Sequence, residues 1–270
     1  MNKGIFLQKS ARIILLVIII GFLLPTTNII QGKSGNEDSV SEIIFNAHFD
    51  SQIEQFMEEG HIPSIAAGVV YKDEIIWKKG YGNQSDIDTV YKLYSISKTF
   101  TSTAILQLYE QDIIDLDDDV NEYLPFEFRN PNYPNTSITF RHLLSHRSSL
   151  RYSDTYSFNL RNLHPPFPEN LEEYTSPGGS FYNPNTWMDV EPGKRTQYSN
   201  LGFDLLAYLV ELISQRSFEQ YVSDHILTPL EMTNTQYNYS DYNSTKLAHG
   251  YSFNFDSEKN EEYDHFNING

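Results

Sequence analysis

Apolar side chains recur at helical spacing in two stretches of the chain, 41–59 and 95–110. Residues three and four apart share one face of a helix, so each stretch predicts an amphipathic helix with one buried face. The positions that set this spacing are Phe45, Phe49, Ile53, Phe56 and Met57 in the first stretch, and Phe100, Ala104, Ile105 and Leu108 in the second.

Two short apolar runs, 64–71 and 74–79, lie between these predicted helices. The polar pair Lys72 and Asp73 separates them, which is typical of a β-hairpin. A helix, a hairpin and a second helix in this order favour a fold that mixes helices and strands over a helical bundle.

Farther along the chain, the spacing predicts a helix over 137–146, with Thr139 as its N-cap, and another over 205–213. Residues 151–187 are rich in Tyr, Pro, Asn and Gly and carry little periodicity. We therefore expect a long surface segment there, bordering a cleft. The sequence shows no internal repeat.

The first 32 residues have the pattern of an export signal. An apolar run over 13–24 ends at Pro25 and is preceded by three basic residues, Lys3, Lys9 and Arg12. The run is shorter than the roughly 20 residues of a spanning helix, which favours a secretory signal. No small-residue cleavage site follows, so an uncleaved membrane anchor stays open. We expect 33–40 to be a tether and the domain, 41–270, to be secreted or anchored to the outer face of the cell membrane.

The composition limits the classes of partner. The formal net charge is −17, whereas binding to nucleic acid or to an anionic membrane surface requires a basic face. Aromatic residues make up 14% of the chain and can fill the core of one sizeable domain or two lobes. The sequence contains no cysteine, so neither a disulfide framework nor a lipid-modified cysteine is available. No cofactor is expected.

An acidic cluster at 115–119 raises the question of a calcium site. Val120 stands where a calcium loop needs glycine for its sharp turn, and Phe126 stands where a bidentate glutamate belongs. We interpret the cluster as an acidic turn.

His142 and His146 are four residues apart on a predicted helix and could share a metal ion. Leu143 occupies the position of the general-base glutamate in the H-E-x-x-H pattern. A structural histidine pair is favoured, no metal site is assigned, and a metallohydrolase stays open as a hypothesis that chelator would test.

Ser95 and Lys98 are three residues apart at the start of a predicted helix. That spacing places a hydroxyl and an amine on one helical face, with the serine at the positive N-terminal end. A lysine within hydrogen-bonding reach is a recurrent activator of a serine nucleophile, and S-x-x-K opens the motifs of β-lactamases and penicillin-binding proteins. About one such motif is expected by chance in a chain of this length, so the motif alone decides nothing.

Tyr198 and Asn200 form a second candidate site, after Pro192 and Gly193 and before the apolar helix. In a strand or extended loop, side chains at alternate positions point to the same side. A core tyrosine with a satisfied hydroxyl is an equally favoured interpretation of Tyr198 from its spacing alone.

From about residue 61 to 270 the chain resembles the serine hydrolases of the class C β-lactamase fold, which include penicillin-recognising carboxypeptidases, D-amino-acid peptidases and esterases. The blocks that carry the resemblance are the 63–82 hairpin, Ser95-x-x-Lys98 with Thr99-Phe100-Thr101, Tyr123-Leu124-Pro125 after the acidic turn, 138–146, Pro192-Gly193, Tyr198-Ser199-Asn200 and Ala248-His249-Gly250-Tyr251. Seven blocks in the order of the family are far more specific than any one of them.

The resemblance implies an α+β fold with an antiparallel sheet flanked by helices and a second lobe of helices and loops. Its parts would be 41–94 in the sheet lobe, 95–247 in the helical lobe, and 248–270 returning to the sheet. It also implies that Ser95 attacks a carbonyl, that Lys98 and Tyr198 form the base, and that Asn200 holds Lys98 and a substrate amide.

Two departures from the family pattern stand out. Ser149 occupies a position where the family usually has glycine, which alters a turn. The third motif of the family, Lys-Thr-Gly or His-x-Gly on a later strand, is not reached before residue 270, so we expect a C-terminally truncated chain with an incomplete sheet. Residues 33–270 alone would then be loosely packed or poorly soluble, and inactive. Losing one oxyanion-hole donor typically costs about 100- to 1000-fold in rate.

The sequence therefore predicts a serine hydrolase that acts through an acyl-enzyme at Ser95. Its substrate would be an amide or ester: a β-lactam, a peptide of the D-Ala type found in peptidoglycan, or a small ester. The alternative is a catalytically inert module that binds cell-wall peptides or a partner.

Overall fold

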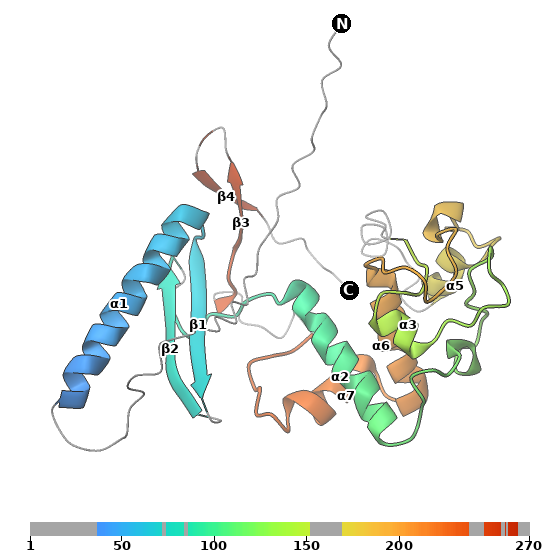
Figure 1. The fold of residues 1–270 in the computed structure, drawn as a ribbon, viewed down its shortest axis with the longest axis horizontal. Helices are drawn as coiled ribbons and strands as arrows, with labels where there is room; N and C mark the ends of the chain where they lie inside the picture. Colours follow the sequence, from blue (N-terminus) through green and yellow to red (C-terminus); the bar gives the residue numbers. More distant parts are fainter. Residues whose placement is uncertain are drawn as a thin grey trace, which may run out of the picture. The chain divides into compact units, whose positions relative to one another are not determined.

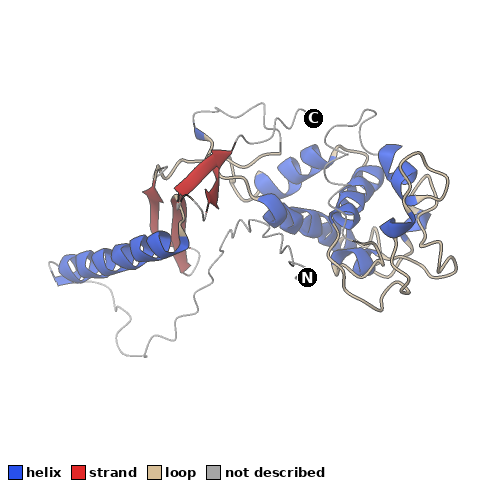
Figure 2. Ribbon diagram, turned by 90° about the horizontal axis from the view of Figure 1, so that it is seen from above, coloured by secondary structure: helices blue, strands red, loops and turns tan. Residues whose placement is uncertain are grey.

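The computed structural model describes residues 37–71, 74–83, 86–151, 169–237, 246–254, 257 and 259–263 (Figure 1). The chain divides into two compact units. The sheet unit comprises residues 1–92 and 243–267, and the helical unit comprises 93–242 and 268–270. In the described part of the chain, every strand belongs to the sheet unit, whereas the helical unit consists of helices and loops (Figure 2). The fold is of the α+β class, as predicted.

The sheet unit begins with α1 (Glu37–Gly60), followed by the antiparallel strands β1 (Ser64–Tyr71) and β2 (Glu74–Gly82). The predicted hairpin is confirmed, and its turn at 72–73 lies outside the described residues. The helix already includes residues 37–40, so the prediction of a tether there is wrong.

Asp50 joins α1 to the hairpin. Its carboxylate accepts hydrogen bonds from Lys79 at 2.6 Å and from the Tyr81 hydroxyl at 2.5 Å. Beside them the Phe49 ring meets Trp77 edge-on at 4.8 Å. A half-buried aromatic contact and two hydrogen bonds to Asp50 thus hold α1 against β2.

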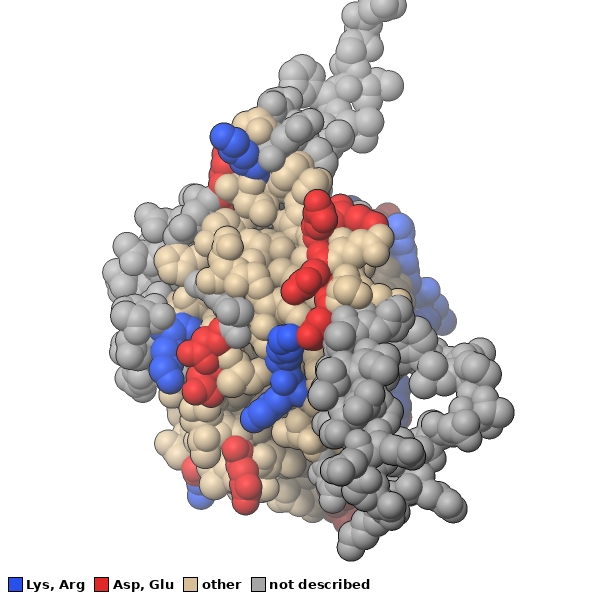
Figure 3. Space-filling view, turned by 90° about the vertical axis from the view of Figure 1, so that its left-hand side faces the viewer, with Lys and Arg blue, Asp and Glu red and all other residues tan. Residues whose placement is uncertain are grey.

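The far end of the hairpin exposes its apolar side chains. Val70, Ile75 and Ile76 are 67%, 64% and 59% exposed, and Val70 pairs with Ile75 across the strands. On the face drawn in Figure 3, acidic and basic side chains of the described residues are interspersed.

The strands β3 (Gly250–Asn254) and β4 (Lys259–Tyr263) form a second two-stranded antiparallel sheet. The expected return of 248–270 to the first sheet is therefore not seen among the described residues. Strands joined by a short connection pair at little loop-closure cost. Leu247 nevertheless makes an isolated parallel bridge with Val90, and Phe253 stacks on His61 at 3.7 Å, so this segment contacts the first hairpin region.

The helical unit is built around α6 (Asn200–Ser214), which packs against α2, α3 and α7. Its other elements are η1 (Tyr94–Ile96), α2 (Ser97–Glu110), η2 (Val120–Glu122), α3 (Phe140–Leu144), α5 (Glu169–Thr175), η3 (Pro184–Thr186), α7 (Phe218–Val222) and the π-helical turn η4 (Ser223–Leu227). The largest fully buried side chains are Trp187, Phe128, Phe140, Ile105, Leu108, Ile138, Leu143, Leu150, Leu171, Leu205, Leu206 and Leu209. This core fixes the helices that carry the candidate site.

Two predictions for this unit need correction. The helix predicted over 137–146 begins only at Phe140: Thr139 is its N-cap, as predicted, but the carbonyl of Ile138 accepts a bond from the backbone of Val120 and holds the preceding residues extended. The segment predicted as a surface excursion over 151–187 contributes α5 and the core residues Leu171 and Trp187; residues 152–168 lie outside the described part.

In the part of the chain that the structure describes, no helix is long and apolar enough to cross a membrane. The apolar run at 13–24 lies outside that part.

Candidate active site

Ser95 lies in η1, a 3₁₀ helix of one turn that leads directly into α2. The predicted place at the start of the helix is therefore confirmed. Its hydroxyl lies 2.7 Å from the hydroxyl of Tyr198, and either oxygen can be the donor. Thr101, Ala104, Ile105 and Leu108 are buried on the other side of α2, so the helix that carries Ser95 is anchored in the core.

The backbone at the nucleophile is strained. Tyr94 has a φ of 45°, in the left-handed region that costs a non-glycine residue about 1–2 kcal/mol. The Ser97 hydroxyl donates to the Tyr94 carbonyl at 2.5 Å and holds the turn. The Tyr94 ring is 49% exposed. Strain of this kind persists where the surrounding structure over-determines it, and it clusters at active sites.

Tyr198 and Asn200 are placed by the start of α6. Ser199 is the buried N-cap, and its hydroxyl accepts from the backbone of Gly202 at 3.2 Å. Tyr198 therefore stands just before the cap and Asn200 is the first helical residue. The sequence predicts an extended segment in which Tyr198 and Asn200 point to the same side. The chain is extended at Ser199, but α6 begins at Asn200, so the alternation of an extended segment does not reach Asn200.

Lys98 donates to the Asn200 side-chain oxygen at 2.7 Å. Its ammonium lies 5.0 Å from the centre of the Tyr198 ring and 5.7 Å from that of Phe203. The structure thus brings the four predicted residues together as two bonded pairs, Ser95 with Tyr198 and Lys98 with Asn200. The positive charge of Lys98 lies over the Tyr198 ring, where a cation–π contact is attractive.

His146 is a neighbour of this group that sequence reasoning did not assign to the site. Its ring lies 4.5 Å from that of Tyr198 and 5.0 Å from that of Phe203. Burial and then the charge of Lys98 lower the pKa of His146 below its usual value, so the imidazole is neutral near pH 7. The one feature of the sequence that pointed to His146 is its position as the last residue of the 138–146 block, which carries part of the family resemblance.

The metal hypothesis for the two histidines gains no geometric support. Nδ1 of His142 accepts from the backbone of Thr139 at 3.4 Å and completes the capping box of α3, whereas Nδ1 of His146 accepts from the backbone of Ser199 at 3.2 Å. Each imidazole thus serves a different loop. Among the described residues, no group of three or more His, Asp or Glu side chains is placed to hold a metal ion.

Gly193 lets the loop before Tyr198 approach α3 closely. Its φ is 87°, and a Cβ atom there would lie 2.7 Å from the His142 ring. The Gly193 amide donates to the Arg147 carbonyl at 2.7 Å, and the Gln197 amide donates to the His146 carbonyl at 2.7 Å. Two backbone bonds therefore dock the 193–197 loop on the 146–147 turn and fix where Tyr198 emerges.

Ser149 also adopts a left-handed backbone, with a φ of 70°, which explains why glycine suits this position. The buried serine hydroxyl accepts from Asn130 at 2.8 Å and lies 2.5 Å from the Val190 carbonyl. These bonds offset the strain that glycine would avoid. The departure from the family pattern is thus accommodated by a polar contact away from Ser95.

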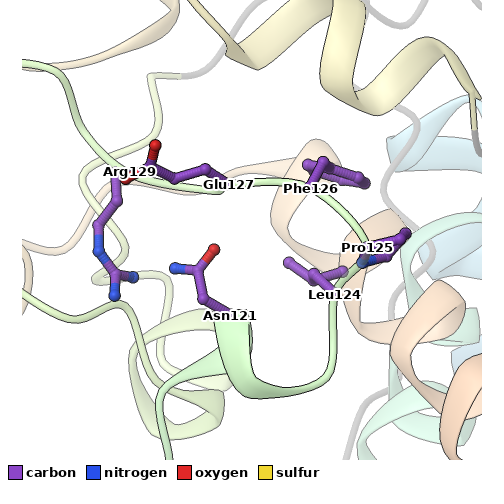
Figure 4. Close-up of a pocket in the computed structure, with 6 residues that line it drawn as sticks. All are labelled: Asn121, Leu124, Pro125, Phe126, Glu127 and Arg129. Carbon is purple, nitrogen blue, oxygen red and sulfur yellow. The ribbon is translucent and has the colours of Figure 1, made fainter.

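A separate surface pocket of about 310 Å³ lies in the loop after η2 (Figure 4). Its lining residues are Asn121, Leu124, Pro125, Phe126, Glu127 and Arg129. The Asn121 amide is bonded to the backbone of Phe128, and the Arg129 guanidinium is paired with Asp119. These polar groups hold the turn together. The four predicted site residues do not line this pocket.

The acidic cluster at 115–119 also forms a turn, as predicted. Burial alone would raise the pKa of Asp119, but hydrogen bonds from Arg129, the Asn121 amide and Ser137 lower it to about 2. Asp117 forms an exposed two-point pair with Arg141 on α3. The cluster therefore tethers the loop before η2 to the start of α3.

The family model described as Beta-lactamase matches residues 49–264. The chain belongs to the beta-lactamase family. "Protein flp" of Staphylococcus aureus strain MW2 is 31% identical over 212 residues, which cover 75% of this chain and 40% of that protein. "Beta-lactamase-like protein 2" of Dictyostelium discoideum is 32% identical over 254 residues, which cover 89% of this chain and 44% of that protein. The chain thus spans less than half the length of these relatives.

Solved structures of this family share the fold. The octameric penicillin-binding protein homologue from Pyrococcus abyssi aligns with a TM-score of 0.65 at 24% identity, over 80% of this chain and 50% of that one. FmtA from Staphylococcus aureus aligns with a TM-score of 0.60 at 19% identity, over 78% of this chain and 56% of that one. These alignments show that the chain has the fold of these proteins.

Proposed function

We propose that this chain carries the nucleophile and the base of a serine hydrolase that forms an acyl-enzyme at Ser95. The observation that carries the proposal is the 2.7 Å contact between the hydroxyls of Ser95 and Tyr198. A serine hydroxyl is a weak nucleophile until a base removes its proton. Tyr198 is the side chain hydrogen-bonded to Ser95, and Lys98 lies beside it.

In the proposed reaction Tyr198 starts as a phenolate. The Ser95 oxygen attacks a carbonyl carbon while its proton passes to the Tyr198 oxygen, which thereby becomes a neutral hydroxyl. The tetrahedral intermediate then collapses, the carbon–nitrogen or carbon–oxygen bond of the substrate breaks, and Tyr198 returns the proton to the leaving group. Water releases the acyl group by the same steps in reverse order. Base catalysis of this kind contributes about 100- to 10,000-fold.

Lys98 stabilises the phenolate form of Tyr198 that precedes the proton transfer, and Asn200 holds the Lys98 ammonium in place. The Lys98 ammonium donates to Asn200 at 2.7 Å and is thereby held near the Tyr198 ring. Two unit charges about 4 Å apart attract each other by about 4 kcal/mol at an effective dielectric of 20. The N-terminal end of α2 adds a favourable partial charge at Ser95.

The substrate class that we propose is an amide or ester: a β-lactam, a D-Ala-type peptide of peptidoglycan, or a small ester. The names of similar structures support this range. EstCE1 is a hydrolase with promiscuous acyltransferase activity, and the Yersinia pestis protein is a beta-lactamase/D-alanine carboxypeptidase. Both align with a TM-score of 0.59 and show the fold alone.

We further propose that the domain acts outside the cytoplasm, secreted or held at the outer face of the membrane by residues 13–24. The support is the sequence pattern of three basic residues followed by the apolar run. Protease accessibility on intact cells tests this proposal. Recovery of the chain in the cytosol with its first residues intact would overturn it.

Labelling by a fluorophosphonate probe tests the catalytic proposal, because the probe needs a reactive serine rather than a particular substrate. The 270-residue chain should be labelled, and Ser95→Ala should not. Thr103→Ala is the matched control and should be labelled like the wild type: Thr103 is an exposed residue of α2 whose hydroxyl donates to the Thr99 carbonyl within that helix. Equal labelling of wild type and Ser95→Ala would refute the assignment. Binding of cell-wall peptides without any labelling would support the inert binding module instead.

A further inference from the structure

His146 holds the segment that carries Tyr198 from both sides. Its Nδ1 accepts from the Ser199 amide at 3.2 Å, and its carbonyl accepts from the Gln197 amide at 2.7 Å. The two donors are the immediate chain neighbours of Tyr198. A residue flanked by two such bonds has little freedom to change where its side chain emerges.

The imidazole ring of His146 also contacts the Tyr198 side chain. The ring planes of His146 and Tyr198 are tilted by 39° at a centre-to-centre distance of 4.5 Å. The centre of the His146 ring also lies 5.0 Å from that of the Phe203 ring in α6, and these two ring planes are tilted by 40°. Phe203 in turn lies 5.7 Å from the Lys98 ammonium. His146 therefore packs on the tyrosine and on the aromatic side chain beside the lysine.

This arrangement needs a neutral imidazole. An Nδ1 atom that accepts a backbone hydrogen bond carries no proton, so the remaining proton is on Nε2. The groups that face the ring are Lys98 on α2, Tyr198 before α6 and the apolar Phe203. Lys98 is the cation whose charge acts on it, and Arg147, the next residue, acts instead on His142. A protonated His146 would lose the Ser199 bond and add a second cation near Lys98.

The backbone of His146 is adapted to this role. Its φ is 56°, a left-handed conformation in which histidine and asparagine occur more often than most residues. The turn brings both the ring and the carbonyl to the same three-residue segment. A residue in an ordinary helical conformation would continue α3 and present neither group to residues 197–199.

We propose that His146 is a positioning residue: in its neutral form it aims the Tyr198 hydroxyl at Ser95 through the Ser199 amide and the aromatic contact. This inference rests on the proposed function for its catalytic consequence. Misplacing a reacting group by about 1 Å costs on the order of 100-fold in rate. Acid that protonates His146 should therefore slow acylation of Ser95 before it unfolds the domain.

Three variants of the full chain separate the two contacts. His146→Asn keeps an acceptor near the Nδ1 position and tolerates the left-handed backbone, but removes the ring. His146→Phe keeps the ring and removes the acceptor. His146→Gly tolerates the backbone and removes both. His142→Asn is the control for general loss of stability, because His142 lies in α3 just before the His146 turn and its imidazole is bonded to Thr139.

Two readouts are needed, amide hydrogen exchange at Gln197 and Ser199 and the pH profile of fluorophosphonate labelling. Exchange at Ser199 should accelerate in the Phe and Gly variants and stay protected in the Asn variant. Labelling should fall about 100-fold in His146→Gly and less in the other two. The decrease in labelling at low pH that protonation of His146 causes should be absent in all three variants. His142→Asn should retain this decrease.

The outcomes separate the two proposals. Unchanged exchange and an unchanged decrease in labelling at low pH in all three variants would overturn the positioning role. Accelerated exchange in His146→Gly, together with a wild type that never labels, would refute the acyl-enzyme while leaving the structural clamp on Tyr198 in place. An equal loss of labelling in His142→Asn would assign the effect to stability and overturn the inference.

Discussion

The Tyr198 hydroxyl lies 2.7 Å from the Ser95 hydroxyl although 103 residues separate the two in the chain. The contact exists because α2 and α6 pack together with Ser95 and Tyr198 at their adjoining N-terminal ends. The two helices bring the base and the nucleophile together, and the 146–147 turn and the 193–197 loop fix the position of Tyr198. This relationship carries the proposed chemistry.

Removal of the base should slow acylation without unfolding the domain. Tyr198→Phe keeps the ring that packs on His146 and deletes only the oxygen that would take the proton, so labelling should fall by about 100- to 10,000-fold. Lys98→Ala should fall in the same range, because the charge beside Tyr198 is lost. Labelling rates and thermal unfolding curves of both variants provide the measurement. Wild-type rates in Tyr198→Phe would exclude Tyr198 as the base.

The strained backbone at Tyr94 predicts an unusual order of stability. Its φ of 45° suits glycine better than any residue with a Cβ. Tyr94→Gly should therefore be more stable than Tyr94→Ala by about 1 kcal/mol, although glycine is normally the more destabilising of the two. The unfolding free energies of the two variants, measured with denaturant, test this order. Because both variants lack the tyrosine ring, the loss of its contacts does not affect the difference between them. A more stable alanine variant would show that the strain is absent in solution.

Asp119 should make the helical unit sensitive to strong acid. Its pKa is lowered to about 2 from the usual 3.8 of an aspartate, so the carboxylate stabilises the fold above pH 4. This contribution, about 2 kcal/mol, is lost as the pH falls from about 4 to 2. The difference in unfolding free energy between wild type and Asp119→Asn should shrink across that window. A difference that stays constant with pH would contradict the lowered pKa.

The exposed apolar end of the hairpin should limit solubility. Ile75→Thr and Ile76→Thr, at positions 64% and 59% exposed, should reduce light scattering at high protein concentration while changing stability by less than about 0.5 kcal/mol. Ile105→Thr is the matched control in the core and should cost roughly 3 kcal/mol. Unchanged scattering in the two hairpin variants would place the aggregation-prone surface elsewhere.

Local patterns were sufficient to predict much of the fold and to single out Ser95 and Lys98 as candidates. Helical spacing located α1, α2 and α6, and the spacing of Ser95 and Lys98 placed both at the start of α2. The family resemblance added Tyr198 and Asn200, whose role their spacing alone left undecided. These features depend on residues close in sequence or on an ordered set of motifs.

The features that sequence did not predict depend on contacts between distant, irregular segments. His146 belongs to the site because its ring bonds the Ser199 amide 53 residues away. Trp187 is buried although its segment has no periodicity, because its indole donates to the Thr175 carbonyl and its ring packs on Phe128. Irregular backbone buries side chains without a repeating pattern, so periodicity cannot locate them.

Peptide mapping after fluorophosphonate treatment tests the central claim most directly. The 270-residue chain and its Ser95→Ala variant are incubated with the probe, digested and analysed by mass spectrometry. The account predicts one adduct per chain, on the peptide that contains Ser95, and none in the variant. An adduct on another residue that persists in Ser95→Ala, or an unmodified Ser95 in folded wild type at saturating probe, would contradict it.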